Sequence, residues 1–146
     1  MSVKISPEII AEIADQLDMG MKCFYHIATG ELESYPDELN SSFSLDNELW
    51  QETIDKVEAN PHEYLSFDAM GSDESFRIME TFVSNISDDT IRHRFEDAIM
   101  FKKPFQNFKQ LIYDYPDLRQ QWFDYKKRQD IEWVLTQLEI YNLDAD

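Results

Sequence analysis

Cysteine, glycine and long apolar runs are all scarce in this sequence of 146 residues. Cys23 is the only cysteine, so no disulfide can form within the chain, which favours a reducing compartment. Three glycines are too few to build a P-loop or a dinucleotide-binding fingerprint. No apolar run approaches the roughly 20 residues of a membrane span, and the first residues lack the pattern of a signal peptide. We therefore expect a soluble, cytoplasmic protein and no bound cofactor.

Basic side chains are also scarce. The chain has 13 lysines and arginines against 30 aspartates and glutamates, a net charge of −17, which argues against broad binding to phosphate backbones. Hydrophobic residues make up 42% of the chain and aromatic residues 14%, which predicts a packed core rather than a disordered chain. The length fits a single domain over residues 1–146.

The acidity is divided unevenly along the chain. Residues 1–74 hold 17 acidic and 3 basic side chains, a net charge of −14. Residues 75–146 hold 13 acidic and 10 basic side chains, a net charge of −3. The charge therefore belongs mostly to the first half.

Hydrophobic periodicity predicts an α+β fold, with a small antiparallel sheet of about three strands in the first half packed against a mostly helical second half. A start at Ser6-Pro7 is typical of a helix N-terminus, because the serine can cap and the proline needs no N–H partner there. The part at 1–70 is expected to contain a helix over 7–18, strands over 21–27 and 32–35, a helix capped by Ser44 and ended by Asn60-Pro61, and a strand over 63–67.

The part at 75–141 is expected to be helical throughout. Apolar residues recur at helical spacing and are interrupted at 102–104 and 114–116. We expect Ser87 to cap one of these helices and the acidic loop 68–74 to cap the helix before it, in preference to binding calcium. The last apolar stripe changes phase near Gln129, where we expect a bend.

The sequence offers no clear nucleophile or metal site. Cys23 lies on the apolar face of a predicted strand, which favours a buried structural thiol over a reactive one. The three histidines are far apart, without the paired spacing of metal ligands. His93 stands four residues from Asp89 and from Asp97, which could hold a metal or relay a proton, but an exposed helical pair is the favoured interpretation.

Two regions remain as candidate interaction sites. A basic and aromatic segment could neutralise and stack on a single strand of RNA, although its helical spacing also suits a buried stripe. Its candidate binding residues are Lys102, Lys103, Phe105, Phe108 and Lys109. The acidic first half could dock a basic partner protein or imitate nucleic acid, or it could simply be a solvated face.

The order of several short motifs resembles a known family. The motifs are Thr29-Gly30-Glu31, Glu63-Tyr64-Leu65, Ile78-Met79-Glu80-Thr81-Phe82, Ala98-Ile99, Phe105-x-x-Phe108-Lys109 and Trp122-Phe123-x-Tyr125. Together they resemble the bacterial group called uncharacterised protein family 0158, from about Ile9 to Tyr141. The resemblance implies an α+β domain of bacterial, cytosolic origin and implies no activity.

The preferred hypothesis is a non-enzymatic protein-binding or regulatory domain, because charge is segregated and no catalytic constellation stands out. The alternative is an RNA or single-stranded nucleic-acid binding module that uses the segment 102–109. A second alternative is an enzyme whose carboxylate site is hidden, because 30 acidic residues make some close pairs unavoidable.

Overall fold

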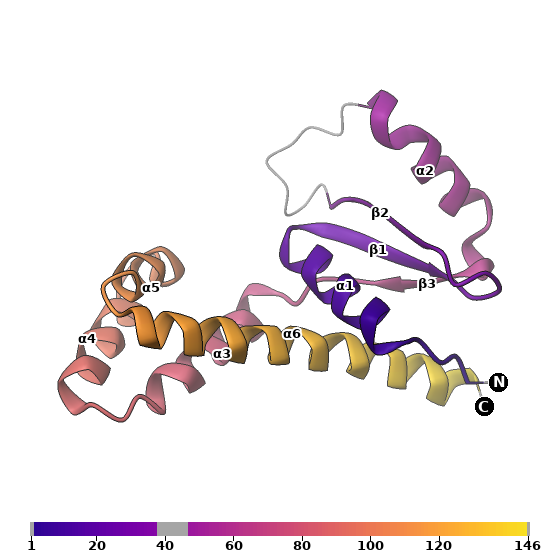
Figure 1. Ribbon diagram of the computed structural model, residues 1–146. Helices are drawn as coiled ribbons and strands as arrows, with labels where there is room; N and C mark the ends of the chain where they lie inside the picture. The colour runs from indigo at the N-terminus through magenta and orange to yellow at the C-terminus, as the bar shows by residue number, and fades with distance from the viewer. Residues whose placement is uncertain (1, 38–46, 146) are drawn as a thin grey trace. The chain divides into compact units, whose positions relative to one another are not determined.

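A computed structural model describes residues 2–37 and 47–145 of the chain (Figure 1). The expected capping residue Ser44 lies outside these described residues. The elements, in chain order, are α1 Pro7–Asp18, β1 Met21–His26, β2 Leu32–Pro36, α2 Asn47–Ala59, a 3-10 turn Pro61–Glu63, β3 Tyr64–Phe67, α3 Ser72–Ser84, α4 Asp89–Met100, α5 Pro104–Ile112 and α6 Pro116–Ala145. The expected α+β class is confirmed.

The first helix forms as its sequence predicts. The Ser6 side chain accepts a hydrogen bond from the Ile9 N–H, and Pro7 opens the helix. Ile10, Ile13 and Leu17 are buried on one face, which is the spacing of an amphipathic helix.

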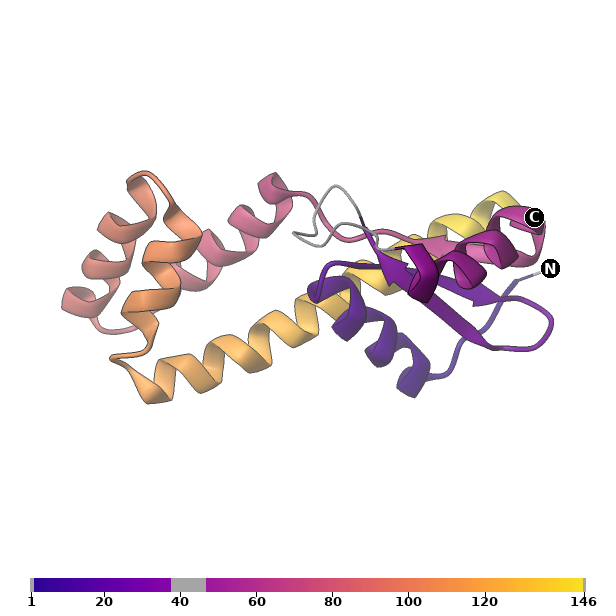
Figure 2. The ribbon, with the colours of Figure 1, turned by 90° about the horizontal axis from the view of Figure 1, so that it is seen from above.

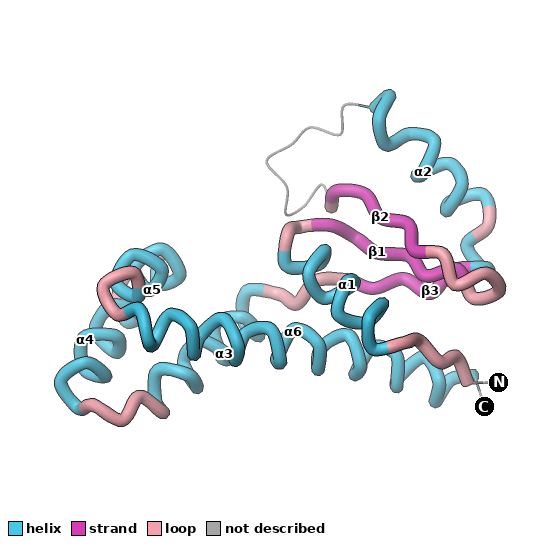
Figure 3. The backbone as a smooth tube through the Cα atoms, viewed as in Figure 1, coloured by secondary structure: helices cyan, strands magenta, loops and turns pink. Residues whose placement is uncertain are grey.

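The three strands form one antiparallel sheet in the order β2-β1-β3 (Figure 3). β1 is the central strand: Cys23 stands opposite Ser34 of β2 and opposite Phe67 of β3. Gly30 takes a positive φ of 76° in the hairpin turn, a conformation that a glycine adopts without steric cost. The hairpin and the third strand are therefore confirmed.

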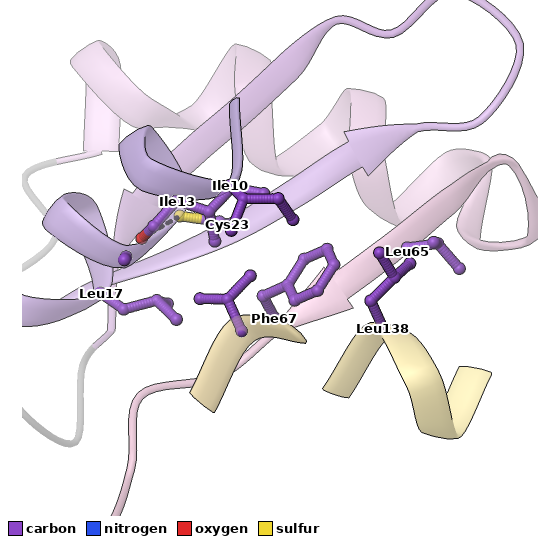
Figure 4. Packing of buried hydrophobic residues seen from close by; sticks show 9 residues of the cluster. Ile10, Ile13, Leu17, Cys23, Leu65, Phe67 and Leu138 are labelled. Carbon is purple, nitrogen blue, oxygen red and sulfur yellow. Dashed lines mark hydrogen bonds between the residues drawn. The ribbon is translucent and has the colours of Figure 1, made fainter. Parts of the chain in front are cut away.

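Both faces of this sheet are covered by helices. On one face, buried side chains of α1 and the C-terminal part of α6 pack against Cys23, Leu65 and Phe67 (Figure 4). On the other face, Phe24 and Tyr64 pack with Val57. Figure 1 shows α2, which carries Val57, on that side of the sheet. Because β1 buries residues on both faces, the sheet is an interior layer.

The chain folds as two compact units. Unit 1 comprises residues 1–69 and 130–146, and unit 2 comprises residues 70–129. The chain passes between the units once at Ala69–Met70 and again inside α6, at Gln129–Asp130. The single-domain prediction stays a prediction.

The C-terminal part of α6 belongs to unit 1 through hydrogen bonds as well as apolar packing. The Trp133 indole and the Gln137 amide both donate to the Asp68 carbonyl, at 2.8 and 3.1 Å. The Tyr141 hydroxyl donates to the Ser66 carbonyl at 2.8 Å. Near the chain ends, the Asn142 side chain pairs with the Val3 backbone through both N–H and carbonyl, and Figure 2 shows the ends close together. The sequence-based division placed residues up to 141 in the helical part, whereas these contacts place residues 130–145 with the sheet.

Unit 2 is built from α3, α4, α5 and the first part of α6. Its core is aromatic: the Phe95 ring is fully buried, 5.5 Å from the Phe108 ring centroid. Phe82 and Trp122 meet edge to face with centroids 5.2 Å apart. Such pairs contribute beyond their buried area, by about 0.5–1.5 kcal/mol each.

One expected helix cap is displaced by one residue, and the other falls inside the expected loop 68–74. The α4 cap is Asp88, whose carboxylate accepts from the Ile91 N–H at 3.0 Å, and Ser87 precedes it. Either residue type can cap, and the backbone of Asp88 has the extended conformation that a cap needs. For α3 the cap is Gly71, which has no side chain to bond, while Asp73 and Glu74 lie in the first turn.

Gln129, where a bend is expected, lies inside α6, and the bend itself stays a prediction. α6 is unbroken over 30 residues. Its apolar stripe changes phase because Trp122 and Tyr125 face the core of unit 2, whereas Val134 and Leu138 face the core of unit 1. None of the described helices is long and apolar enough to span a membrane.

Candidate functional site

The basic and aromatic segment forms the corner between α4 and α5. Lys102 and Lys103 lie in the three-residue connection, and Phe105 and Lys109 lie on α5. All three lysines are exposed. The corner therefore offers cations to solvent.

The two phenylalanines of this segment have different environments. The Phe108 side chain is 3% exposed, with its ring centroid 4.8 Å from that of Trp122. Phe105 is 43% exposed and meets the Phe76 ring edge-on. Phe108 is thus a core residue with no ring face open to a ligand, as its helical spacing with Ile112 allowed.

The most exposed aromatic side chain of the corner was missed by sequence reasoning. Phe101 is 70% exposed and its neighbour Met100 is 78% exposed. Phe101 directly precedes Lys102 and is the residue that follows α4, outside the apolar stripes of both helices. The sequence did carry a signal for this exposure. Phe101 is an apolar residue directly before the Lys-Lys-Pro break, where no helix face requires it to be buried.

The backbone of the corner is strained and held in place. Lys103 is the one described residue other than glycine with a positive φ, at 60°, and this left-handed conformation costs roughly 1 kcal/mol. The Asn107 amide donates to the Ala98 and Lys102 carbonyls at 2.9 and 3.0 Å. The Asn107 N–H donates to the Lys103 carbonyl at 3.0 Å. One side chain thereby fixes the direction in which the corner projects.

An open groove of about 560 Å³ lies between α4 and α5, beside this corner. Arg94, Asp97, Phe101 and Asp114 contribute to its lining. Asp97 and Asp114 are exposed to solvent. Acid–base catalysis usually relies on carboxylates in a water-excluding site, so this pair does not favour the enzyme hypothesis.

The two folded units carry very different charges. Unit 1 holds 20 acidic and 3 basic side chains, a net charge of −17. Unit 2 holds 10 acidic and 10 basic side chains and is neutral. The whole net charge of the chain therefore belongs to the unit that contains the sheet.

The cations of unit 1 are few and partly paired. Lys56 lies 2.9 Å from a Glu33 carboxylate oxygen and 3.9 Å from one of Glu31. The hydrogen bond to Glu33 and the charges nearby raise the pKa of Lys56. Lys22 lies 3.9 Å from Asp68. Surface pairs of this kind are worth little, but they reduce the positive charge that unit 1 presents to solvent.

α1 carries a row of outward carboxylates. Glu8, Glu12 and Asp15 are exposed and recur at helical spacing opposite the buried face. Asp15 lies in the last turn, where the helix dipole is negative and no basic residue is present. An acidic residue there destabilises a helix, so Asp15 is not explained by the needs of folding, whereas Glu8 in the first turn suits the helix dipole.

A second, smaller groove lies in unit 1, along the C-terminal part of α6. Its volume is about 270 Å³, and it is lined by Ser2, Leu135, Leu138, Glu139, Asn142 and Leu143. Leu135 is 40% exposed and Leu143 is 70% exposed, whereas Leu138 reaches the core. Residues 130–146 contain five acidic side chains and no basic one. The groove is thus apolar within acidic surroundings.

Cys23 is confirmed as a buried residue. Its side chain is 0% exposed, and its thiol faces the Ile13 carbonyl at 3.9 Å (Figure 4). The thiol also lies 3.6 Å from the Gln16 amide oxygen. Burial, helped by the charge of Glu12, raises the pKa of the thiol to about 12. Such a thiol stays protonated and unreactive at neutral pH.

The histidines also take local roles. His93 is exposed, and its Nδ1 lies 2.6 Å from the Asp89 backbone carbonyl oxygen, while the Asp89 carboxylate pairs with Arg92 at 2.7 Å. The expected side-chain pair of His93 is thus replaced by a contact with the backbone. Among residues 2–37 and 47–145, no three His, Cys, Asp or Glu side chains gather as a metal site would require.

Comparison with known proteins places this chain in a family. The model of the uncharacterised protein family UPF0158 matches residues 21–145. A UPF0158 protein of Pseudomonas aeruginosa is 29% identical over 83 residues, which are 57% of this chain and 54% of that relative. The matched region thus spans about half of the relative's length. No solved structure matches the chain. Because the family model covers most of its residues, this protein belongs to the uncharacterised protein family UPF0158.

Proposed function

We propose that this protein is a cytoplasmic, non-enzymatic protein-binding or regulatory module whose unit 1 docks a basic partner protein. One observation carries this proposal: unit 1 holds the entire net charge of −17, while unit 2 is neutral. A field concentrated on one unit attracts and orients a basic partner, raising its association rate.

The row of carboxylates on α1 is the docking surface that we propose. Glu8, Glu12 and Asp15 are exposed and adjacent to one another along the helix. Asp15 opposes the helix dipole at a cost of about 0.3–1 kcal/mol, and natural sequences break such folding rules mainly where function requires it. A solvated face that served only solubility would not need acid at this end of α1.

The test is crosslinked capture from the native bacterial lysate at low and at moderate salt. A variant with Glu8→Gln, Glu12→Gln and Asp15→Asn should recover the partner about tenfold less well, equivalent to ~1.4 kcal/mol spread over three charges. A variant with Glu80→Gln, Asp117→Asn and Asp124→Asn makes the same change in net charge on exposed residues of unit 2 and serves as the control.

The control should recover as much partner as the unmodified chain. No enriched protein at low salt would reject the proposal. Equal losses in the two triple variants would also reject it, because net charge alone would then explain the capture.

RNA binding at the corner is the second candidate, favoured by the exposed Phe101 beside Lys102 and Lys103. Phosphate contacts release counterions, so a band shift on mixed RNA should weaken with salt and when Lys102, Lys103 and Lys109 become alanine. Absence of a shift at low salt would exclude this candidate.

A further inference from the structure

The corner between α4 and α5 presents an apolar group that the fold does not use. Met100 and Phe101 are the two most exposed large hydrophobic side chains of unit 2, at 78% and 70%. The Asn107 hydrogen bonds and the left-handed Lys103 hold this short loop in one conformation. Exposed apolar side chains on a fixed, strained loop are typical of a contact surface.

The groove along α6 has an apolar lining that suits these exposed apolar side chains. Leu135 and Leu143 are exposed beside it, and Leu138 connects its floor to the core of unit 1. Glu139 also lines the groove. A single apolar anchor followed by cations would fit this combination, because the anchor would cover the leucines and the cations would face the carboxylates.

Charge decides which occupant suits the groove. The α6 groove of a second copy would face it with like charge, because residues 130–146 carry five acidic groups and no basic one. The corner between α4 and α5 instead offers the positive charges of Lys102 and Lys103. Among the exposed large hydrophobic side chains in the described part of the chain, Phe101 is the one followed directly by two lysines.

We infer that the corner of one copy docks into the α6 groove of a second copy of this chain. Phe101 inserts between Leu135 and Leu143, and Lys102 and Lys103 pair with Glu139 and the neighbouring carboxylates. The contact joins two different surfaces, so each copy has one corner and one groove to offer. This self-association goes beyond the proposed docking of a basic partner on α1 and uses different residues.

Sedimentation of the full chain tests this contact at low salt over a rising protein concentration. The unmodified chain should associate, and about 0.5 M salt should weaken the association, because charges are then screened within a few ångströms. Phe101→Ser and Leu143→Ser should each leave the chain monomeric at concentrations where the unmodified chain associates. Both side chains are largely exposed, so circular dichroism should show an unchanged fold.

Ile140→Ser is the matched control on α6. Ile140 is 55% exposed and lies outside the groove lining, so its replacement should leave association intact.

Mixing the two monomeric variants gives the most direct test of the contact. Phe101→Ser retains a groove and Leu143→Ser retains a corner, so the two variants should form a mixed dimer although each is monomeric alone.

Four outcomes would overturn the inference. The unmodified chain could stay monomeric at all concentrations. The Ile140→Ser control could lose association as fully as Leu143→Ser, which would place the contact on another face of α6. The mixture could stay monomeric, or the corner could bind only added mixed RNA, which would assign Phe101 to nucleic acid instead.

Discussion

At the scale of single residues, burial separates structural side chains from those available for binding. Phe108 and Phe101 lie seven positions apart and both could be read as stacking residues, yet one is 3% and the other 70% exposed. Sequence periodicity predicted that Phe108 could be buried, because it shares a helical stripe with Ile112. It made no prediction for Phe101, because a residue in a short connection between helices belongs to no apolar stripe.

The Cys23 thiol gives a test of burial at this scale. A thiol-reactive chromogenic reagent at pH 8 should leave the folded chain unmodified and should react promptly after unfolding in urea. The buried thiol is protonated at that pH, since its pKa is raised to about 12. Prompt modification of the folded chain would contradict the packing of β1 under α1.

The same pKa shift fixes the sign of a stability change. The thiol ionises near 9.0 when unfolded and near 12 when folded. Between these values the unfolded chain releases a proton that the folded chain retains, so the free energy of unfolding should fall as the pH rises above about 9. Below that pH the thiol is protonated in both states and contributes no pH dependence. Cys23→Ala should remove this part of the decline.

Trp122→Ala tests the aromatic core of unit 2. The Trp122 ring meets those of Phe82 and Phe108 at 5.2 and 4.8 Å, so its removal should lower the free energy of unfolding by about 3 kcal/mol in urea titrations. Phe123→Ala, at the exposed neighbouring position, should change it by less than about 1 kcal/mol. A loss below about 1 kcal/mol for Trp122→Ala would mark Trp122 as a surface residue.

At the scale of elements, local signals were enough to place most helices and strands. Ser6-Pro7 marked the start of α1, and Lys103-Pro104 marked the break before α5, because these residue types act through the backbone nearest to them. The cap of α4 lies one residue after the expected one. Ser87 and Asp88 are both able to cap, and the sequence does not show which of them has the backbone conformation of a cap. The role of α6 could not be predicted, because its two halves pack in different units.

The helix dipole of α1 yields a prediction at this scale. Asp15→Lys places a cation in the last turn and should raise the free energy of unfolding by about 0.5 kcal/mol. Glu8→Lys makes the same charge change in the first turn, where the dipole is positive, and should be less favourable. Comparing the thermal unfolding of the two variants separates the effect of the helix dipole from the effect of reducing the net negative charge. Equal shifts in both would show that the position along α1 does not matter.

At the scale of the whole molecule, the fold sharpens the division of charge. Dividing the sequence at residue 74 gives net charges of −14 and −3 for the two parts, whereas the two folded units carry net charges of −17 and 0. The difference arises because residues 130–146 are acidic and fold with the sheet, and two further acidic residues, Asp73 and Glu74, belong to unit 2. Sequence order could not reveal this, since the return of the chain to unit 1 depends on contacts such as Tyr141 with Ser66.

We propose that unit 1 docks a basic partner through its carboxylates. A carbodiimide joins carboxylates directly to contacting lysines, so mass spectrometry of crosslinked complexes from the native lysate reports which acidic residues touch the partner. We predict that these residues fall within 1–69 and 130–146, concentrate on α1, and lose their crosslinks at about 0.5 M salt. Crosslinks confined to residues 70–129, or no crosslinked partner at all, would contradict docking through unit 1.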